Sequence, residues 1–337
     1  MMKENNKSIL LALVAVLSWS TVATAFKVAL MHLTHFEMLL VASVTSLLIF
    51  AVVLTIQRRW REVLNLSRGM WGYFALLGLL NPVAYYLVLF RAYNLLPAQI
   101  AQPVNYIWPV LLVVLLAIFT GQRIPPRKYI GMFVSLGGLV VISVGGKQIS
   151  SAGIPPAGLV LGVMSAFLWA AYWMVNNRYK ECADATVACF MCFLFGSIYL
   201  GLGALVVGVD LSTVPGLLSG MYVGAFEMGI PFICFGLAIR KTTNPALVNQ
   251  LCYLSPFLSL FFVSTVLGEP IVVTTYIGLI LIVAGIVFNE YAGKKGEWIP
   301  CYSLRAGCSL TFALRASLII FFNCRVRSCT TPCFSGL

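Results

Sequence analysis

Two stretches of this chain match each other 147 residues apart: Pro109, Gly121, Tyr129-Ile130-Gly131 and Gly138 recur as Pro256, Gly268, Tyr276-Ile277-Gly278 and Gly285. Further upstream, Pro97-Ala98 corresponds to Pro245-Ala246 and Trp19 corresponds to Trp169, with the offset drifting by up to three residues. A repeat of this length predicts a chain built from two similar halves.

The composition indicates that both halves lie in a membrane. Apolar residues make up 61% of the 337 residues and charged residues 9%, and the mean hydropathy is +0.96. A soluble domain carries roughly 25% charged residues. The apolar runs are about 20 residues long, which is the length of helix that crosses the hydrocarbon layer. They do not alternate with polar residues, so they predict helices rather than barrel strands.

We expect an all-α polytopic membrane protein with ten transmembrane helices, five in each half. Because five is odd, the second half must be inverted relative to the first, an arrangement typical of secondary transporters. The predicted spans are Ile9–Met31, Phe36–Ile56, Met70–Phe90, Pro97–Phe119, Tyr129–Gly146, Ala157–Asn177, Ala185–Val209, Val214–Ile239, Pro245–Leu267 and Val272–Tyr291.

These spans divide the chain into a first repeat (1–146), a connecting loop (147–156), a second repeat (157–292) and a tail (293–337). The tail has five cysteines after position 300, and a metal-binding or redox role is one interpretation. The cysteine spacing matches no structural zinc site and the tail has no histidine, so we favour an irregular extension. We therefore predict no metal site and no cofactor.

Basic residues indicate the orientation of the chain. With the N-terminus in the cytoplasm, fifteen Lys and Arg residues of the ten-span core fall on the cytoplasmic side, whereas Arg91 and Lys147 fall on the other side. This bias predicts a multi-pass protein of the plasma (inner) membrane with both termini in the cytoplasm. The apolar run continues past Ala23-Thr24-Ala25, which favours a retained span over a cleaved signal peptide. The net charge of +12 needs no nucleic-acid partner, because its basic residues are scattered over several loops and the tail.

The fourth and ninth spans carry polar and aromatic residues next to a proline at mid-depth. A proline removes a backbone donor, so the carbonyl one turn back loses its usual partner. We expect a kink and a free carbonyl beside a tyrosine in each half, although kinked packing without any ligand is the alternative. The predicted substrate contacts here are Asn105, Tyr106, Asn249 and Tyr253.

Polar and aromatic residues in other spans complete the predicted site. Those expected to contact the substrate are Trp19, Asn81, Tyr85, Trp169 and Tyr172. Glu227 is the carboxylate placed deep in the bilayer, and we predict that it is the coupling group, with a purely structural glutamate as the alternative. Lys27 either contacts a substrate carboxylate or snorkels to the headgroups.

No enzyme motif supports a catalytic function. The chain has two histidines, no His-Glu-x-x-His and no Gly-x-Ser-x-Gly. Gly145-Gly146-Lys147-Gln148 lacks the upstream glycine and the terminal Ser or Thr of a phosphate-binding loop. We therefore expect that the protein is not an enzyme and has no catalytic residues.

Several motifs resemble the drug/metabolite transporter superfamily, EamA-type. They are Ser18-Trp19-Ser20-Thr21 followed by Lys27, and Glu227-Met228-Gly229. Val104-Asn105-Tyr106-Ile107-Trp108-Pro109 and Ala166-Phe167-Leu168-Trp169-Ala170-Ala171-Tyr172 resemble its aromatic amino-acid exporter branch, and the resemblance covers about Ile9 to Tyr291.

The resemblance implies an inner-membrane exporter of amino acids or related metabolites that works by alternating access. We expect a small-molecule substrate with amino-acid or aromatic, amphipathic character, a midplane cavity, proton coupling, and a monomer or weak dimer in the bilayer. The alternatives are a membrane receptor or scaffold that does not transport, or a transporter of other metabolites or drugs.

Overall fold

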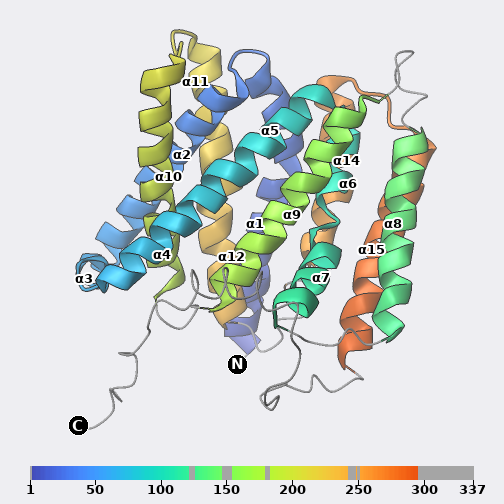
Figure 1. Cartoon of the computed structure of the whole chain (residues 1–337), viewed down its shortest axis with the longest axis horizontal. Helices are drawn as coiled ribbons and strands as arrows, with labels where there is room; N and C mark the ends of the chain where they lie inside the picture. Colours follow the sequence, from blue (N-terminus) through green and yellow to red (C-terminus); the bar gives the residue numbers. More distant parts are fainter. Residues whose placement is uncertain are drawn as a thin grey trace, which may run out of the picture. The chain divides into compact units, whose positions relative to one another are not determined.

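The computed structural model describes residues 2–120, 126–145, 154–178, 183–241, 248 and 251–294 of the 337. The described residues of the first half form α1 (Met2–Leu30), α2 (His35–Ile56), α3 (Trp60–Leu64), α4 (Arg68–Gly78), η1 (Leu79–Ala84), α5 (Tyr85–Leu95), α6 (Ala98–Asn105), α7 (Trp108–Thr120) and α8 (Pro126–Gly145). Those of the second half form α9 (Pro156–Arg178), α10 (Ala185–Val207), α11 (Val214–Val223), η3 (Gly224–Gly229), α12 (Ile230–Lys241), η4 (Cys252–Leu254), α14 (Ser255–Leu267) and α15 (Val273–Lys294) (Figure 1).

Every described element is helical, and many of the helices are long enough to cross a bilayer. Seven candidate spans combine sufficient length with sufficient hydropathy, and two shorter apolar helices, Cys252–Leu267 and Val273–Asn289, follow them. The prediction of an all-helical polytopic membrane protein is therefore confirmed. The predicted Cys-rich tail lies, from 295 onward, outside the described residues.

Three of the predicted spans are interrupted near a proline, and a fourth, Val214–Ile239, contains the π turn η3. Between α4 and α5 the chain passes through η1, where Asn81 has extended backbone angles (φ −142°, ψ 118°) just before Pro82. The span that contains Pro109 breaks between α6 and α7, and η4 precedes Pro256 in α14. Proline cannot donate a helical hydrogen bond, so breaks at these places are expected. η3 is a π-type turn that carries Glu227.

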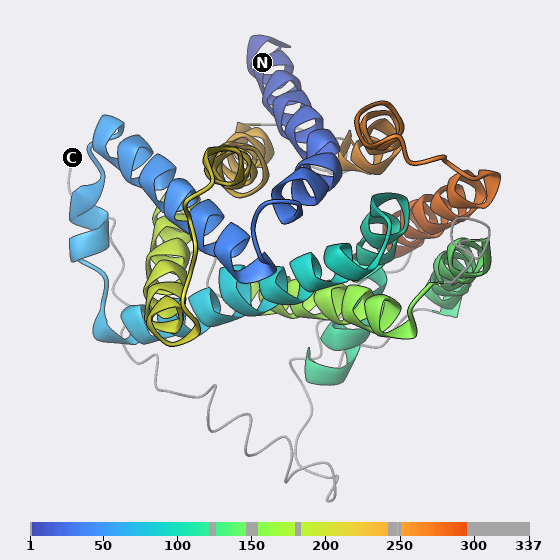
Figure 2. The same cartoon turned by 90° about the horizontal axis from the view of Figure 1, so that it is seen from above.

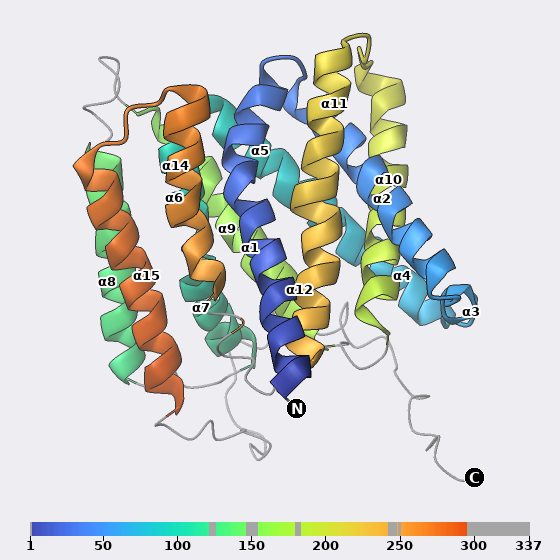
Figure 3. The ribbon, with the colours of Figure 1, turned by 180° about the vertical axis from the view of Figure 1, so that it is seen from behind.

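Helices of the two halves pack chiefly against each other. α1 lies between α12 and α14, α9 packs against α5, α6 and α7, and α2 packs against α10 (Figures 2 and 3). Buried side chains from both halves, including Phe26, Phe50, Phe90 and Phe193, form one continuous apolar core. Neither half therefore buries its helices without the other.

α8 and α15 form the most extensive helix pair, and glycines bring their backbones together. A Cβ atom on Gly138 would lie 2.5 Å from the carbonyl oxygen of Gly278, and one on Gly131 would meet the carbonyl oxygen of Gly285. Because the partner number falls as the residue number rises, the two helices are antiparallel. Small residues permit this close approach, which replaces the hydrophobic effect as the source of helix association within lipid.

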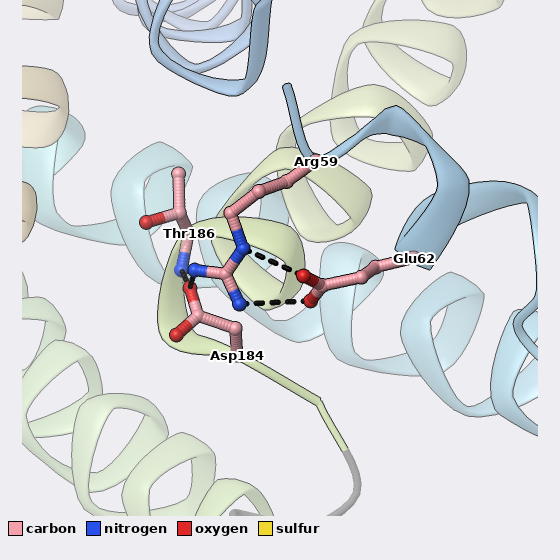
Figure 4. A network of polar contacts seen from close by, with 4 residues as sticks. All are labelled: Arg59, Glu62, Asp184 and Thr186. Atoms are coloured by element: carbon pink, nitrogen blue, oxygen red, sulfur yellow. Dashed lines mark hydrogen bonds and ion pairs between the residues drawn. The ribbon is translucent and has the colours of Figure 1, made fainter. Parts of the chain in front are cut away.

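Polar contacts join α2 and α10 at opposite ends. Glu37, in the first turn of α2, accepts a hydrogen bond from the backbone N–H of Asp210 (2.8 Å). At the other end, the Arg59 guanidinium binds Glu62 (2.7 Å) and Asp184 (2.9 Å), and Asp184 also caps α10 through the N–H of Thr186 (Figure 4). The hydrogen bonds that Arg59 donates to Glu62 raise the pKa of Arg59, so its guanidinium stays charged at neutral pH.

Candidate functional site

Glu227 occupies the centre of the polar contacts between the two halves. Its side chain is 9% exposed and lies in the π turn η3, which packs closely on α2 through Gly224. The hydroxyl of Tyr86 donates to Oε1 of Glu227 (3.1 Å), and Nε1 of Trp19 donates to its backbone carbonyl (3.2 Å). Oε2 is buried and has no hydrogen-bond partner among the described residues. A buried carboxylate oxygen left open in this way is a natural contact for a proton or a ligand donor.

Tyr85 carries a second chain of hydrogen bonds toward α6 and α9. Its hydroxyl donates to Oδ1 of Asn105 (3.3 Å), and Nδ2 of Asn105 donates to Oγ of Ser165 (2.8 Å). The rings of Tyr85 and Tyr86 lie 4.5 Å apart, so neighbouring side chains of α5 connect Asn105 with Glu227. The structure thus brings together three of the predicted residues, Tyr85, Asn105 and Glu227, and places Tyr86 and Ser165 beside them.

Aromatic rings from four helices, α1, α5, α9 and α12, lie next to these polar groups. Trp169 stacks on Tyr85 (4.7 Å between ring centroids) and on Tyr172 (5.4 Å). Phe232 of α12 lies 6.1 Å from Trp169 and 6.5 Å from Trp19, so it joins the two repeat-related tryptophans. Faces of this kind favour an aromatic solute or an organic cation.

Asn81 lies at the break between α4 and α5. Its side chain is fully buried next to the Tyr172 hydroxyl, and beyond that contact neither amide atom has a partner among the described residues. Buried amides are rarely left unbonded, so this amide fits a polar group of a ligand or a water molecule. The extended backbone at Asn81, a conformation that the following Pro82 favours, places the amide there.

The remaining predicted residues lie at the edge of this cluster or outside it. The hydroxyl of Tyr106 lies beside Ser255 of α14, and Tyr253 is half-buried in η4. Asn249 lies outside the described residues. Lys27 is half-buried near the end of α1 and is attracted electrostatically to Glu269, not to Glu227.

Sequence reasoning missed Tyr86, Ser165, Phe232 and Glu269 as site residues. The one available signal was for Glu269, which directly follows the repeat glycine Gly268. The side chains of Tyr86 and Phe232 are ordinary components of an apolar span, and only the packing of helices from opposite halves gives them their partners.

Two cavities lie away from Glu227. A groove of about 560 Å³ runs between α1, α11 and α14, lined by residues that include Thr21, Thr24, Leu218, Tyr222 and Phe262. A small cavity of about 40 Å³ lies next to Arg59 and Asp184. Neither is lined by Glu227, so the midplane cavity stays a prediction. Among the described residues, no group of His, Cys, Asp and Glu could hold a metal ion.

Comparison with known proteins agrees with this architecture. An uncharacterized transporter of Clostridium kluyveri is 25% identical over 52% of this chain and 58% of its own length, so the match spans less than two thirds of that relative. The aromatic amino acid exporter YddG of Salmonella typhimurium is 22% identical over 57% of this chain and 67% of its own length. A protein crystal structure with 21% identity has the same fold, with a TM-score of 0.61 over 86% of this chain and 98% of that one.

The model of the EamA-like transporter family matches the chain twice, over residues 6–144 and 156–291. The two matches together cover more than half of the chain and nearly all of the helices described above. The relatives named above are a transporter and an exporter, not enzymes. This chain is a multi-pass membrane transporter, not an enzyme, and it belongs to the EamA-like transporter family.

Proposed function

We propose that this protein is a secondary exporter of amino acids or related aromatic, amphipathic solutes, coupled to protons. The similarity to the aromatic amino acid exporter YddG supports the substrate class. We further propose that the exporter lies in the plasma membrane with both ends in the cytoplasm, in keeping with the basic residues of its loops.

The proposed mechanism is alternating access between inverted repeats, residues 1–146 and 157–292, with ten membrane crossings. The glycine contacts of α8 and α15 support this. Gly131 and Gly138 correspond to Gly278 and Gly285 in the repeat, whereas the contacts pair Gly131 with Gly285 and Gly138 with Gly278. If each glycine is replaced by its repeat counterpart, the contact Gly131–Gly285 becomes the contact Gly278–Gly138. The two contacts are therefore equivalent, as a two-fold axis between inverted halves requires.

The observation that carries the proposed site is the bonding of Glu227. Its carboxylate belongs to the second half, its two donors, Tyr86 and Trp19, belong to the first half, and Oε2 is left open. A group that bridges the halves in this way senses their relative movement. We propose that Glu227 exchanges a proton or binds the substrate amine. The aromatic ring of the substrate would contact Trp19, Tyr85, Trp169 and Tyr172. The polar groups of the substrate would contact Asn81 and Asn105.

The test is flux of labelled phenylalanine and tryptophan in proteoliposomes, with and without a pH gradient. Wild-type protein is expected to transport at least one of them and to respond to the gradient. Glu227→Gln keeps the shape of the side chain but cannot ionise, so it is expected to abolish the response to the gradient.

Asp210→Asn is the matched control, because it removes a carboxylate from an exposed loop. It is expected to leave the flux and the gradient response unchanged. Gradient-dependent flux that survives in Glu227→Gln would contradict the coupling role. The absence of flux of any amino acid, with flux of other metabolites, would replace the proposed substrate class.

A further inference from the structure

Glu269 of the second half holds the start of α6, a helix of the first half. Its Oε1 accepts from the N–H of Ala98 (3.2 Å) and its Oε2 from the N–H of Gln99 (3.4 Å). The Gln99 side chain extends the contact, since its Nε2 donates to the carbonyl of Pro270 (2.9 Å) and its Oε1 accepts from Thr275 (3.2 Å). Four hydrogen bonds therefore join α6 to the second half, three of them to the segment between α14 and α15 and the fourth to Thr275 in the first turn of α15.

α6 depends on this support because it is short and lacks a cap of its own. It has eight residues, its N-cap is Pro97 with no side-chain hydrogen bond, and Pro103 lies inside it. The first N–H groups of a helix have no intrahelical partner, and a carboxylate there also compensates the helix dipole. Gly268 makes the arrangement possible, since its left-handed φ of +66° ends α14 and directs Glu269 toward α6.

All four bonds cross between the halves at one end of the helix bundle. This is the end at which α1 finishes and α6 begins, opposite the start of α1 (Figures 1 and 3). The Lys27 ammonium adds a positive charge near the same carboxylate. Any movement that opens this end between α6 and α14 must therefore break a charged contact.

The other copy of the repeat has no charge at the matching place. Gly121-Gln122 corresponds to Gly268-Glu269, 147 residues on, so a neutral amide stands where the second copy has a carboxylate. Gln122 itself lies outside the described residues. Hydrogen bonds to a charged acceptor are stronger than neutral ones, so the two ends of an inverted-repeat protein would be held unequally.

We propose that Glu269 is a positioning residue that latches the α6 end of the transporter shut and biases the resting protein toward the conformation closed at that end. The inference rests on the alternating-access mechanism proposed above. Glu269 bonds to the backbone of Ala98 and Gln99, neither of which is a predicted substrate contact, and it acts through α6, the helix that carries Asn105.

Hydrogen–deuterium exchange of the unliganded full chain in lipid nanodiscs tests the latch without any substrate. In Glu269→Gln, exchange of amides 98–101 is expected to rise at least tenfold, because the charged acceptor is lost. Amides 127–131 and 236–241, at the other end, are expected to exchange more slowly, since opening one end closes the other.

Two further variants keep the result interpretable. Glu269→Asp retains the carboxylate and is expected to restore much of the wild-type pattern, and Asp210→Asn removes an exposed carboxylate at the same end and is expected to change neither region. If the exchange rate rises only at amides 98–101, the proposed conformational bias is wrong and Glu269 is a simple helix cap. Unchanged exchange at 98–101 would overturn the positioning role as well. Failure of amino-acid flux would overturn the proposed substrate and leave this result standing.

Discussion

At the scale of single residues, the two consecutive tyrosines of α5 serve different parts of the site. The Tyr86 hydroxyl donates to Glu227 of η3, and that of Tyr85 donates to Asn105 of α6. Both side chains are almost fully buried, so each hydroxyl must find its partner inside the protein. One dipeptide therefore ties the proposed coupling group to the proposed substrate contacts.

Tyr86→Phe is expected to reduce pH-gradient-driven flux about tenfold, because a hydrogen bond to a charged group contributes roughly 1.5–3 kcal/mol. The ring and its contact with Phe90 are kept, so the fold should persist. Tyr93→Phe, in the same helix, is the control and is expected to transport normally. Initial rates of flux in proteoliposomes measure the difference, and equal rates in the two variants would remove Tyr86 from the coupling pathway.

At the scale of helices, the contact between α8 and α15 depends on the absence of side chains. Gly138→Ala places a methyl group against the carbonyl of Gly278, whereas Gly137→Ala, one residue away on α8, meets nothing within 4 Å. We expect Gly138→Ala to lower the free energy of unfolding by about 1–3 kcal/mol through overpacking. Gly137→Ala should be neutral or slightly stabilising, because alanine favours helix. Thermal unfolding in one detergent compares them, and equal melting temperatures would contradict the close contact.

At the scale of the whole molecule, α2 and α10 are held to each other at both ends and should move as one unit. Glu37 and Asp184 are 147 residues apart, one at the start of each helix, and each bonds to the chain beyond the end of the other helix. The two acceptors, Glu37 and Asp184, occupy equivalent positions in the repeat. The donor to Glu37 is the backbone N–H of Asp210, whereas the donor to Asp184 is the Arg59 guanidinium.

Asp184→Asn and Asp184→Ala separate the two roles of this residue. Asparagine retains the ability to cap α10 but loses the ion pair with Arg59, so a destabilisation of about 1 kcal/mol is expected. Alanine loses the cap as well and should cost about 1 kcal/mol more. Chemical unfolding in detergent measures both, and indistinguishable variants would show that capping contributes nothing there.

The sequence predicts the helices well and their partners poorly. Apolar runs locate the spans, and prolines locate the breaks near Pro109 and Pro256, because these effects are local. The break at Asn81 was not predicted, although Pro82 follows it directly. Glu227 also stands out, since a carboxylate in an apolar run is rare. Tyr86 does not, and Glu269 is marked only by its position after the repeat glycine Gly268, because the partners of these two residues lie 141 and 171 positions away in the chain. Periodicity within one helix carries no record of such partners.

The placement of α1 has a consequence for biosynthesis. α1 is made before the other helices described here, yet its neighbours α12 and α14 begin at Ile230 and Ser255, and the acceptor of the Trp19 indole is Glu227. As the ribosome adds residues one at a time, α1 must wait in the bilayer or the insertion machinery while most of the other helices are translated. A chain halted near residue 180 would leave α1 facing lipid along the side that later receives α12 and α14. Assembly of this transporter is therefore a late event, completed only when the last helices arrive.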